Sequence, residues 1–586
     1  MYSFKLNNFR TICPGHPQEN GRTASGIFGA FVGVNRERIL RLASADQHLT
    51  NHTAEFARPE ILQVSDGLYM AIGYALANSI MIEGKDEIVI VDVTESYETG
   101  LAIMSAFRNI TKKPVAAIVY THNHADHTYG AKAFIENDQN PPDIWAHEST
   151  NREFIRTFTA NAAGYRRAMR QFGVFLPNSV NSGIGKMLKY GDGKATIGLV
   201  FPNKFVNQKV TNLTLAGIEM SIVHIPGETD DQIGVWLPKQ EAFLCADDVY
   251  KAFPNLYAIR GTPDRNLLQW VESIDTIIEY SPQHLVPSHT RPVEGKSKIQ
   301  DILTAYRDAI QYIHDQTVRY INQGMDVIDI AKKVVLPESL RTHPYLQEFY
   351  GTTEWSVKTV FTSYLGWFNG DAVDLSPLSK MERADRMVKL VGVSKLLEQA
   401  REALRAKDFQ WALELSSYVL IMNPGHREAT EIKLDCLTSL GSRQKSANGR
   451  NYYLTSAFEL AGLVDSSISL KKNRENGIKI LPIEYIFKAL QVRFKPEDCG
   501  QVTTSVYFVF QDSNIHISLI IRNGIAIVKH GECLHCDLVV TTTETVFKDM
   551  IGSRIKAITA YGSGEIEIQG GAMNFRNIMS CFERNK

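Results

Sequence analysis

The chain has 586 residues, 44% of them hydrophobic, and its 63 Lys and Arg residues nearly balance its 64 Asp and Glu residues. Since a domain usually takes about 100–200 residues, we expect roughly three or four domains with enough chain to bury their cores. The net charge of −1 gives no electrostatic argument for a nucleic-acid partner or an acidic membrane. No apolar run approaches the roughly 20 residues that a membrane span needs.

The sequence shows neither a secretory signal nor a cysteine pattern typical of a disulfide framework. The first ten residues contain no long apolar core, so we expect no secretory signal and a cytoplasmic protein. The seven cysteines are odd in number and scattered, which is typical of a reducing compartment. Cys533-Leu534-His535-Cys536 has CxxC spacing, but a second pair is missing, so free thiols are predicted there.

The first half of the chain divides into an arm and an α/β domain. Residues 1–55 show little periodicity and are interpreted as an extended arm. Residues 56–295 mix short apolar runs with helical patterns, which indicates an α/β domain. The runs that predict its strands are residues 88–93, 114–120, 220–225 and 284–289, and residues 130–135 predict the start of a helix.

The second half changes pattern twice. Residues 296–445 are helical: an apolar stripe from Ile299 to Ile313 recurs at steps of three and four, Gly324 suits a helix end, and a helical hairpin is expected near Lys407-Asp408. Residues 451–586 predict a separate α+β domain, with strands at 505–510 and 515–520 and a hairpin turn at Asn523-Gly524.

One short run concentrates metal-binding chemistry. Between the strand that ends at Tyr120 and the helix expected at residue 130, four potential ligands fall within six positions: His122, His124, Asp126 and His127. Imidazole and carboxylate are common ligands of zinc and related divalent ions. A polar surface loop is the alternative explanation. Because such side chains are hard to explain by packing at this density, a site for two metal ions is predicted.

Two ions need more ligands than four. Three further candidates, Glu228, Asp247 and His289, each follow a predicted strand. A single acidic residue in such a place is usually a solvated turn residue or a helix cap. The three together, each at the end of a strand, favour completion of the site at the edge of the sheets, where α/β proteins commonly place their sites.

These residues resemble a known family. His122-x-His124-x-Asp126-His127 resembles the signature of the metallo-β-lactamase superfamily, whose αββα fold carries a dinuclear zinc site. Pro226-Gly227-Glu228-Thr229 stands where most members have Pro-Gly-His-Thr, and a glutamate there is similar to the alkylsulfatases. Residues 255–261, 364–370 and the last domain resemble their sulfate-binding segment, helical dimerisation domain and sterol-carrier-protein-like domain.

The resemblance implies a ligand set for two zinc ions per chain. His122, His124 and Glu228 would hold one ion, while Asp126, His127 and His289 would hold the other, with Asp247 as the bridge. Two positions depart from the pattern: bacterial relatives generally have a glutamate at Asp247, and a His where this chain has Pro254.

The implied reaction is hydrolysis of an alkyl sulfate ester to alcohol and inorganic sulfate by a metal-bound hydroxide, in a homodimer. Asp126 and Arg260 would be catalytic. Four residues would bind the sulfate: Asn255, Tyr257, Arg260 and Arg265. An exposed salt bridge is the alternative for either arginine alone. Other readings are hydrolysis of another ester or a lactam, and a lipid- or surfactant-binding protein with a vestigial site.

The alkyl tail needs apolar surroundings, for which Tyr129, Phe172, Phe175 and Phe253 are candidates, although core packing explains any one equally well. Three arginines, Arg166, Arg167 and Arg170, either face the sulfate or lie on a solvated helix face. The C-terminal domain is a further candidate to hold a lipid-like tail.

Overall fold

The structure, a computed structural model, describes residues 46–583 except 160, 177–181, 187, 189–194, 465–476, 532 and 534. Most of the arm predicted for residues 1–55 therefore lies outside the described residues. Its last part differs from the prediction, because helix α2 spans Gln47–Ala54. The side chain of Asp46 caps this helix by accepting a hydrogen bond from the His48 backbone N–H at 2.8 Å.

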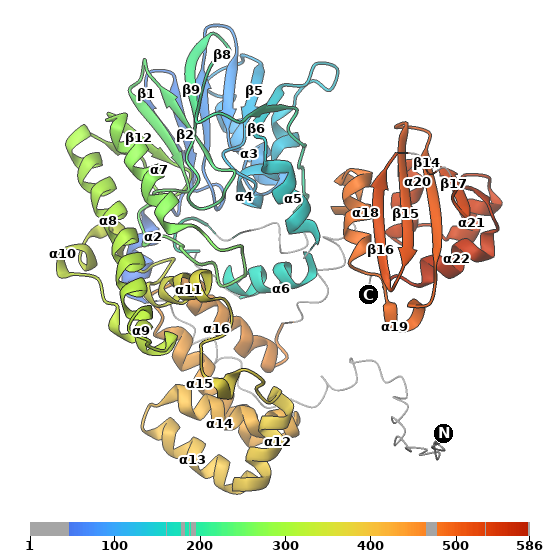
Figure 1. Ribbon diagram of the computed structural model, residues 1–586. Coiled ribbons are helices and arrows are strands. Elements are labelled where there is room, and N and C mark those ends of the chain that lie inside the picture. Colours follow the sequence, from blue (N-terminus) through green and yellow to red (C-terminus); the bar gives the residue numbers. More distant parts are fainter. Residues whose placement is uncertain are drawn as a thin grey trace, which may run out of the picture.

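The α/β domain contains two mixed sheets that pack face to face (Figure 1). The first has seven strands in chain order: β1 (Glu60–Ser65), β2 (Leu68–Ile72), β3 (Ser79–Glu83), β4 (Ile88–Val91), β5 (Val115–Val119), β6 (Asp143–His147) and β7 (Lys204–Val206). The second has six strands in the order β13 (Val293–Glu294), β12 (His284–Pro287), β11 (Ala242–Ala246), β10 (Ile233–Leu237), β9 (Ile218–His224) and β8 (Val210–Leu215).

The core between the sheets is aliphatic. Alternate residues of β4, Val89 and Val91, meet Val235, Leu244 and others of the second sheet in one buried cluster. Side chains alternate across a strand, so the other residues of β4 face outward, where helices cover them. The predicted strands in this domain are therefore confirmed as parts of two helix-covered sheets, the αββα arrangement.

Helices form the outer layers. On the first sheet lie α3 (Tyr97–Phe107), α4 (Ala125–Thr128), the 3₁₀ helix η3 (Ala131–Phe134) and α5 (Thr150–Thr159); on the second lie α7 (Leu267–Glu279) and α8 (Lys296–Ile321). Helix α6 (Asn161–Gln171) lies below the two sheets in Figure 1. The apolar stripe from Ile299 to Ile313 is buried, as predicted. Where a helix start was expected, at residues 130–135, the chain forms the short 3₁₀ helix η3, and the separate helix α4 precedes it inside the metal-ligand run.

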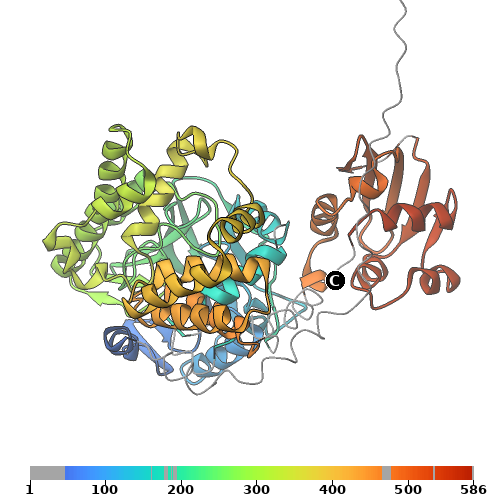
Figure 2. The same ribbon diagram turned by 90° about the horizontal axis from the view of Figure 1, so that it is seen from below.

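The helical region extends below the sandwich in Figure 1, so its later helices stand in front of the sheets in Figure 2. Its members are α9 (Val327–Lys333), α10 (Glu338–Arg341), η5 (Pro344–Leu346), α11 (Thr353–Leu365), η6 (Ala372–Asp374), α12 (Lys380–Val391), α13 (Val393–Arg405), α14 (Phe409–Met422), α15 (Arg427–Ser442) and α16 (Ala447–Leu460). The predicted hairpin joins α13 to α14 at Lys407, whose φ of 63° makes the turn.

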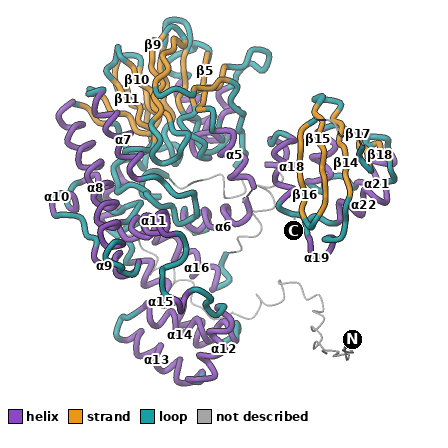
Figure 3. Tube along the Cα trace, in the orientation of Figure 1, coloured by secondary structure: helices purple, strands orange, loops and turns teal. Residues whose placement is uncertain are grey.

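The C-terminal domain is an α+β unit whose strands and helices separate clearly in Figure 3. Its sheet order is β16 (Ile525–His530), β15 (Ile515–Arg522), β14 (Thr504–Phe510), β17 (Leu538–Thr542) and β18 (Glu567–Gln569). The helices are α18 (Ile483–Gln491), α19 (Pro496–Cys499), α20 (Glu544–Ile551), α21 (Ala557–Gly562) and α22 (Ala572–Ser580). Asn523 and Gly524 both have positive φ, 52° and 74°, as the predicted hairpin turn requires.

The cysteines differ from the prediction. Cys533 and Cys536, expected as free thiols, form a disulfide, and Cys499 is bonded to Cys581. Sequence spacing did not reveal the second pair because its members lie 82 positions apart. Among the described helices, none combines the length and apolar character needed to cross a membrane.

Candidate metal centre

The predicted ligands converge where strands of both sheets end. His122 to His127 follow β5, Glu228 follows β9, Asp247 follows β11 and His289 follows β12. Since β4 and β5 run parallel, as do β11 and β12, their carboxyl ends open on the same edge of the sandwich. Positive φ angles at Ala246 and Thr290, 51° and 63°, turn the chain beside two of the ligands.

The structure brings four of these side chains into one group. Potential ligand atoms of His122, His124, Glu228 and Asp247 all lie within 4.8 Å of one another. The Glu228 carboxylate is 3.5 Å from His122 Nε2 and 3.1 Å from His124 Nδ1. All but His124 are buried, so this donor set is shielded from water.

Asp126, His127 and His289 form a second group within the same 4.8 Å limit. Asp247 lies against both groups: its Oδ2 is 3.5 Å from His127 Nε2 and 3.1 Å from His289 Nε2. Two atoms here, His127 Nε2 and Asp247 Oδ1, are buried and have no hydrogen-bond partner. Such atoms suit coordination to a cation, because buried polar atoms otherwise find a partner.

Hydrogen bonds orient the imidazoles. His289 Nδ1 donates to the Leu76 carbonyl at 3.0 Å, which leaves Nε2 facing Asp247 Oδ2 at 3.1 Å. His127 Nδ1 lies 2.7 Å from a carboxylate oxygen of Asp92, a residue that the sequence argument missed. Asp92 also accepts from the backbone N–H of Thr121 and the hydroxyl of Ser288. The available signal was an aspartate directly after the apolar strand β4.

The charges favour cation binding. Burial would raise the pKa of Glu228, but Arg265 and His124 outweigh it and hold that pKa well below its usual value. Burial lowers the pKa of His124 to about 4, so its imidazole is neutral. Burial would also lower the pKa of His127, yet Asp247 and Asp92 raise it well above normal. Protons are thus drawn to the place where a cation would sit.

The Glu228 turn needs its glycine. A Cβ added to Gly227 would lie 2.1 Å from Asp248 Oδ1 and 2.7 Å from the Trp270 ring. Asp248 is buried, and burial raises its pKa well above the usual value. Its carboxylate accepts from the Glu228 backbone N–H and from the side chain of Gln232. Asp248 therefore supports the turn and lies in neither ligand group.

The predicted sulfate segment brings a buried arginine to the same place. Arg265 Nη1 donates to Glu228 Oε1 at 2.8 Å and also to the Asn255 carbonyl. Its Nε and Nη2 atoms, and both polar atoms of the Asn255 side chain, are buried without a hydrogen-bond partner. The three donors among them, Arg265 Nε and Nη2 and Asn255 Nδ2, stand beside the ligand groups and fit an oxyanion.

Arg260 reaches the ligands from the same segment. Its Nη2 lies 3.1 Å from His124 Nε2. Its backbone N–H donates to Gln171 Oε1 at 2.9 Å, and Gln171 is fully buried with an unpartnered Nε2. Arg167 donates to the Ile259 carbonyl at 2.8 Å. Helix α6 thus fixes the loop that carries Arg260, a contribution that the sequence did not reveal.

The remaining candidates are dispersed. Tyr257 is half-buried in the sulfate segment. Arg170 pairs with Glu459 at 3.0 Å rather than with this segment. Phe172 and Phe175 pack in one cluster with Leu76 and Tyr250, both next to His289. Tyr129 and Phe253 belong instead to the hydrophobic clusters outside the two sheets, which is the core packing expected as the alternative for each of them.

Three family models match the chain. Residues 73–289 match the metallo-β-lactamase superfamily, residues 326–462 the alkyl sulfatase dimerisation domain, and residues 472–586 the alkyl sulfatase C-terminal domain. The helices α9 to α16 fall within the second range and the five-stranded sheet within the third.

Proteins similar over most of the chain are alkylsulfatases as well. A linear primary-alkylsulfatase of Pseudomonas sp. (strain ATCC 19151) is 32% identical over 86% of this chain and 98% of its own length. An alkyl/aryl-sulfatase of Saccharomyces cerevisiae is 29% identical over 89% of this chain and 82% of its own. The solved structure of a stereoselective inverting sec-alkylsulfatase from Pseudomonas sp. superposes with a TM-score of 0.86 and 25% identity, covering 92% of this chain and 87% of that one.

Proposed function

Because the chain belongs to the alkylsulfatase family of the metallo-β-lactamase superfamily, a family of sulfuric ester hydrolases, we propose that it hydrolyses alkyl sulfate esters to an alcohol and inorganic sulfate. The proposed cofactor is a pair of zinc ions. His122, His124 and Glu228 would hold one ion, Asp126, His127 and His289 the other, and Asp247 would bridge them.

One observation carries the substrate assignment: buried, unpartnered donors stand beside the ligand groups. Arg265 offers Nε and Nη2 at a depth where an unsatisfied donor is costly. The planar guanidinium suits a tetrahedral oxyanion, since it donates two parallel hydrogen bonds. A neutral ester or lactam offers no oxyanion to these two donors, so a sulfate ester is the better match.

Arg260 and His124 add a second argument. If His124 binds a cation through Nδ1, the neutral imidazole must carry its proton on Nε2. The Arg260 guanidinium and that N–H, 3.1 Å apart, would then be two donors facing each other. An acceptor shared between them relieves this repulsion, and a sulfate oxygen supplies one. We therefore assign Arg260 to the reacting group, with Asn255 and Tyr257 as neutral partners.

The metal pair would supply Lewis acidity, which lowers the pKa of water from about 15.7 to about 7 and so permits hydrolysis at neutral pH. The chain's own part is to position the groups. Glu228 links the two halves of the site, because its carboxylate lies between His124 and the guanidinium of Arg265. Asp126 would be the catalytic carboxylate, and its Oδ2 lies 3.6 Å from His127 Nε2 and 3.5 Å from His289 Nε2.

The apolar tail has a candidate location near this site. The cluster of Phe172, Phe175, Leu76 and Tyr250 adjoins His289, whereas the C-terminal domain contacts the catalytic domain through α18 and α5. The proposed domain limits are 56–295, 296–445 and 451–586. We also propose that the helical region forms a homodimer.

The test is sulfate release from dodecyl sulfate by the zinc-loaded protein. We expect turnover by the wild type and its loss in His124→Ala, because that variant removes a proposed ligand. His284→Ala is the matched control, since His284 begins the strand that His289 follows and lies outside both ligand groups. It should retain turnover.

The metal content separates the explanations. No sulfate release from wild-type protein that holds two zinc ions would contradict the alkylsulfatase proposal and direct the work to other esters. Equal turnover by His124→Ala and the wild type would contradict the ligand assignment. Protein that binds dodecyl sulfate without zinc or turnover would favour a surfactant-binding role.

A further inference from the structure

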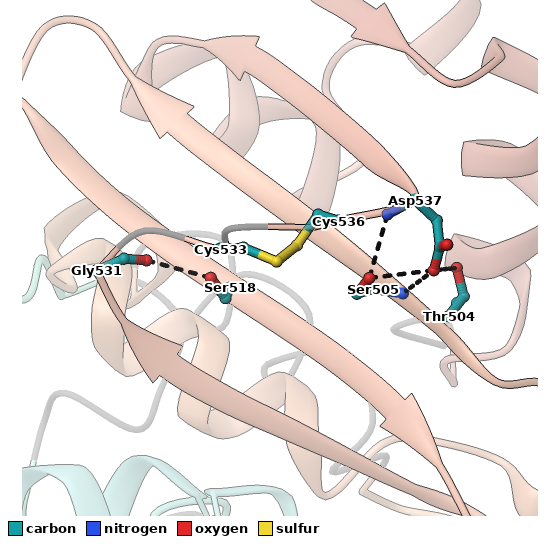
Figure 4. Close-up of a disulfide and its surroundings, with 7 residues drawn as sticks. All are labelled: Thr504, Ser505, Ser518, Gly531, Cys533, Cys536 and Asp537. Atoms are coloured by element: carbon teal, nitrogen blue, oxygen red, sulfur yellow. Dashed lines mark hydrogen bonds between the residues drawn. A yellow bond between two sulfur atoms is a disulfide. The ribbon is translucent and has the colours of Figure 1, made fainter.

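The connection from β16 to β17 carries a cysteine pair outside the metal centre (Figure 4). In the sheet order, β15 and β14 lie between these two strands. The connection therefore passes across both of them before β17 pairs in parallel with β14. Cys533 and Cys536 lie in this crossing, joined by a disulfide with their Cα atoms 5.7 Å apart.

Both ends of the crossing are fixed to the sheet. At the first end, the Gly531 backbone N–H donates to the His516 carbonyl at 3.0 Å, and the Ser518 hydroxyl donates to the Gly531 carbonyl at 3.1 Å. At the other end, the Asp537 carboxylate accepts from the Ser505 backbone N–H at 2.8 Å and from the Thr504 hydroxyl at 3.1 Å. These bonds do not depend on the sulfur–sulfur bond.

The two disulfides of this domain differ in kind. Cys499–Cys581 joins residues 82 positions apart, and Cys581 is buried. A link across so long a loop removes much conformational entropy from the unfolded chain. Cys533–Cys536 closes only three positions, so it contributes far less to stability, and both of its cysteines are half-buried rather than enclosed. Solvent therefore reaches this bond.

We propose that Cys533–Cys536 is a thiol–disulfide exchange site for low-molecular-weight thiols. A thiolate attacks one of the two sulfurs, breaks the Cys533–Cys536 bond and forms a mixed disulfide, and the other cysteine leaves as a thiolate. A second thiol then displaces the first as a small-molecule disulfide. In total, two thiols lose two electrons and two protons, which the pair gains as two thiols.

The anchors make the exchange reversible. With Gly531 and Asp537 held to the sheet, the reduced cysteines stay close together, so the second thiol acts at a high effective concentration when the bond re-forms. Asp537 also lies directly after Cys536, which couples the sulfur to the fixed end of β17. Loss of the Asp537 carboxylate should therefore shift the equilibrium toward the dithiol.

The experiment equilibrates the native full-length protein in graded mixtures of glutathione and glutathione disulfide, followed by alkylation and peptide mass spectrometry. We expect the Cys533–Cys536 peptide to change from disulfide to dithiol and to return when oxidant is added. Cys499–Cys581 should remain oxidised throughout. A pair that stays oxidised in excess glutathione, or that is reduced only together with Cys499–Cys581, would overturn the proposal.

A matched pair of variants tests the anchoring. Asp537→Ala should lower the equilibrium constant for oxidation about tenfold, equivalent to about 30 mV. Asp512→Ala is the control, because Asp512 likewise accepts a backbone hydrogen bond, from Glu544, but outside this crossing. It should leave the constant unchanged. Equal constants in the wild type and both variants would show that the crossing is not built for exchange.

Discussion

Asp92 is the residue on which the orientation of the second ligand group depends. Its carboxylate is fully buried and accepts from His127, Thr121 and Ser288, so every partner is a donor. Carboxylates that orient ligating imidazoles typically contribute 10–100-fold to metal affinity or activity. The position thus links the end of β4 directly to the chemistry of the site.

We expect Asp92→Asn to weaken zinc binding by about 10–100-fold, because the amide presents N–H groups to donors. Competition with a chelator measures this affinity. Asp231→Asn is the control: Asp231 is equally buried and accepts from Asn123 and Thr150, but it contacts no proposed ligand. Matching affinities in the two variants would contradict the role given to Asp92.

Arg265 tests the oxyanion argument. Arg265→Lys keeps the charge near Glu228 but removes the fork that offers Nε and Nη2. Since a hydrogen bond to a charged group contributes about 1.5–3 kcal/mol, we expect kcat/KM for dodecyl sulfate to fall about 10–100-fold. Arg291→Lys is the control, because Arg291 pairs with Glu60 at the surface. An unchanged kcat/KM in Arg265→Lys would remove the substrate assignment.

At the scale of elements, helix α2 is attached to the enzyme through a buried histidine. His52 stacks on Phe349 with ring centroids 4.2 Å apart, and its Nε2 lies 2.9 Å from the Gly183 carbonyl. Burial lowers the pKa of His52 from 6.5 to about 4. The folded protein therefore holds a neutral imidazole at a pH where the unfolded chain binds a proton.

This difference makes stability pH-dependent. Well above pH 6.5, His52 is neutral in both the folded and the unfolded state, so its titration does not change the free energy of unfolding. As the pH falls toward 4, His52 binds a proton in the unfolded state but stays neutral in the folded state, so the folded state loses stability. We expect a loss of about 2 kcal/mol at pH 5, and less loss in His52→Gln, which keeps a donor for Gly183 but does not titrate. The measurement is the free energy of unfolding at pH 7 and at pH 5. An equal loss of that free energy in the wild type and in His52→Gln would contradict this prediction.

Elements with a clear local pattern were predictable. The apolar runs of β4 and β5, the apolar stripe of α8 and the Asn523-Gly524 turn can each be predicted from a local sequence pattern. The seven metal-type residues were found by their spacing and by the strands before them, and the structure brings them together. Their roles as ligands stay a prediction.

Long-range contacts were not predictable. Gln171 meets the backbone of Arg260 across 89 positions, and Cys499 meets Cys581 across 82. No local periodicity encodes either pairing. The aromatic candidates stayed open between tail contact and core packing for the same reason, because local sequence does not show which hydrophobic cluster a Phe or Tyr will join. Helix α4 was not predicted, because a single helical turn within the ligand run is too short to show an apolar period.

At the scale of the molecule, one apolar surface lies far from the metal centre. It spans the end of α11, the following loop and α12, and its exposed members include Tyr364, Leu365, Trp367, Val373, Leu375, Met381 and Leu390. Exposed apolar side chains that gather in one part of a protein indicate an interaction site. This surface falls within the range that matches the dimerisation model, residues 326–462.

Trp367 is the strongest anchor on this surface, since 75% of it is exposed in the single chain and a buried tryptophan covers about 150–250 Å². In a twofold dimer each substitution acts twice. We expect Trp367→Asp to yield monomers by light scattering at micromolar concentration while retaining zinc. Ile558→Asp is the control, because Ile558 is 77% exposed but lies in the C-terminal domain. A Trp367→Asp protein with the wild-type mass would exclude this surface as the dimer contact, whereas monomers from Ile558→Asp would place that contact in the C-terminal domain.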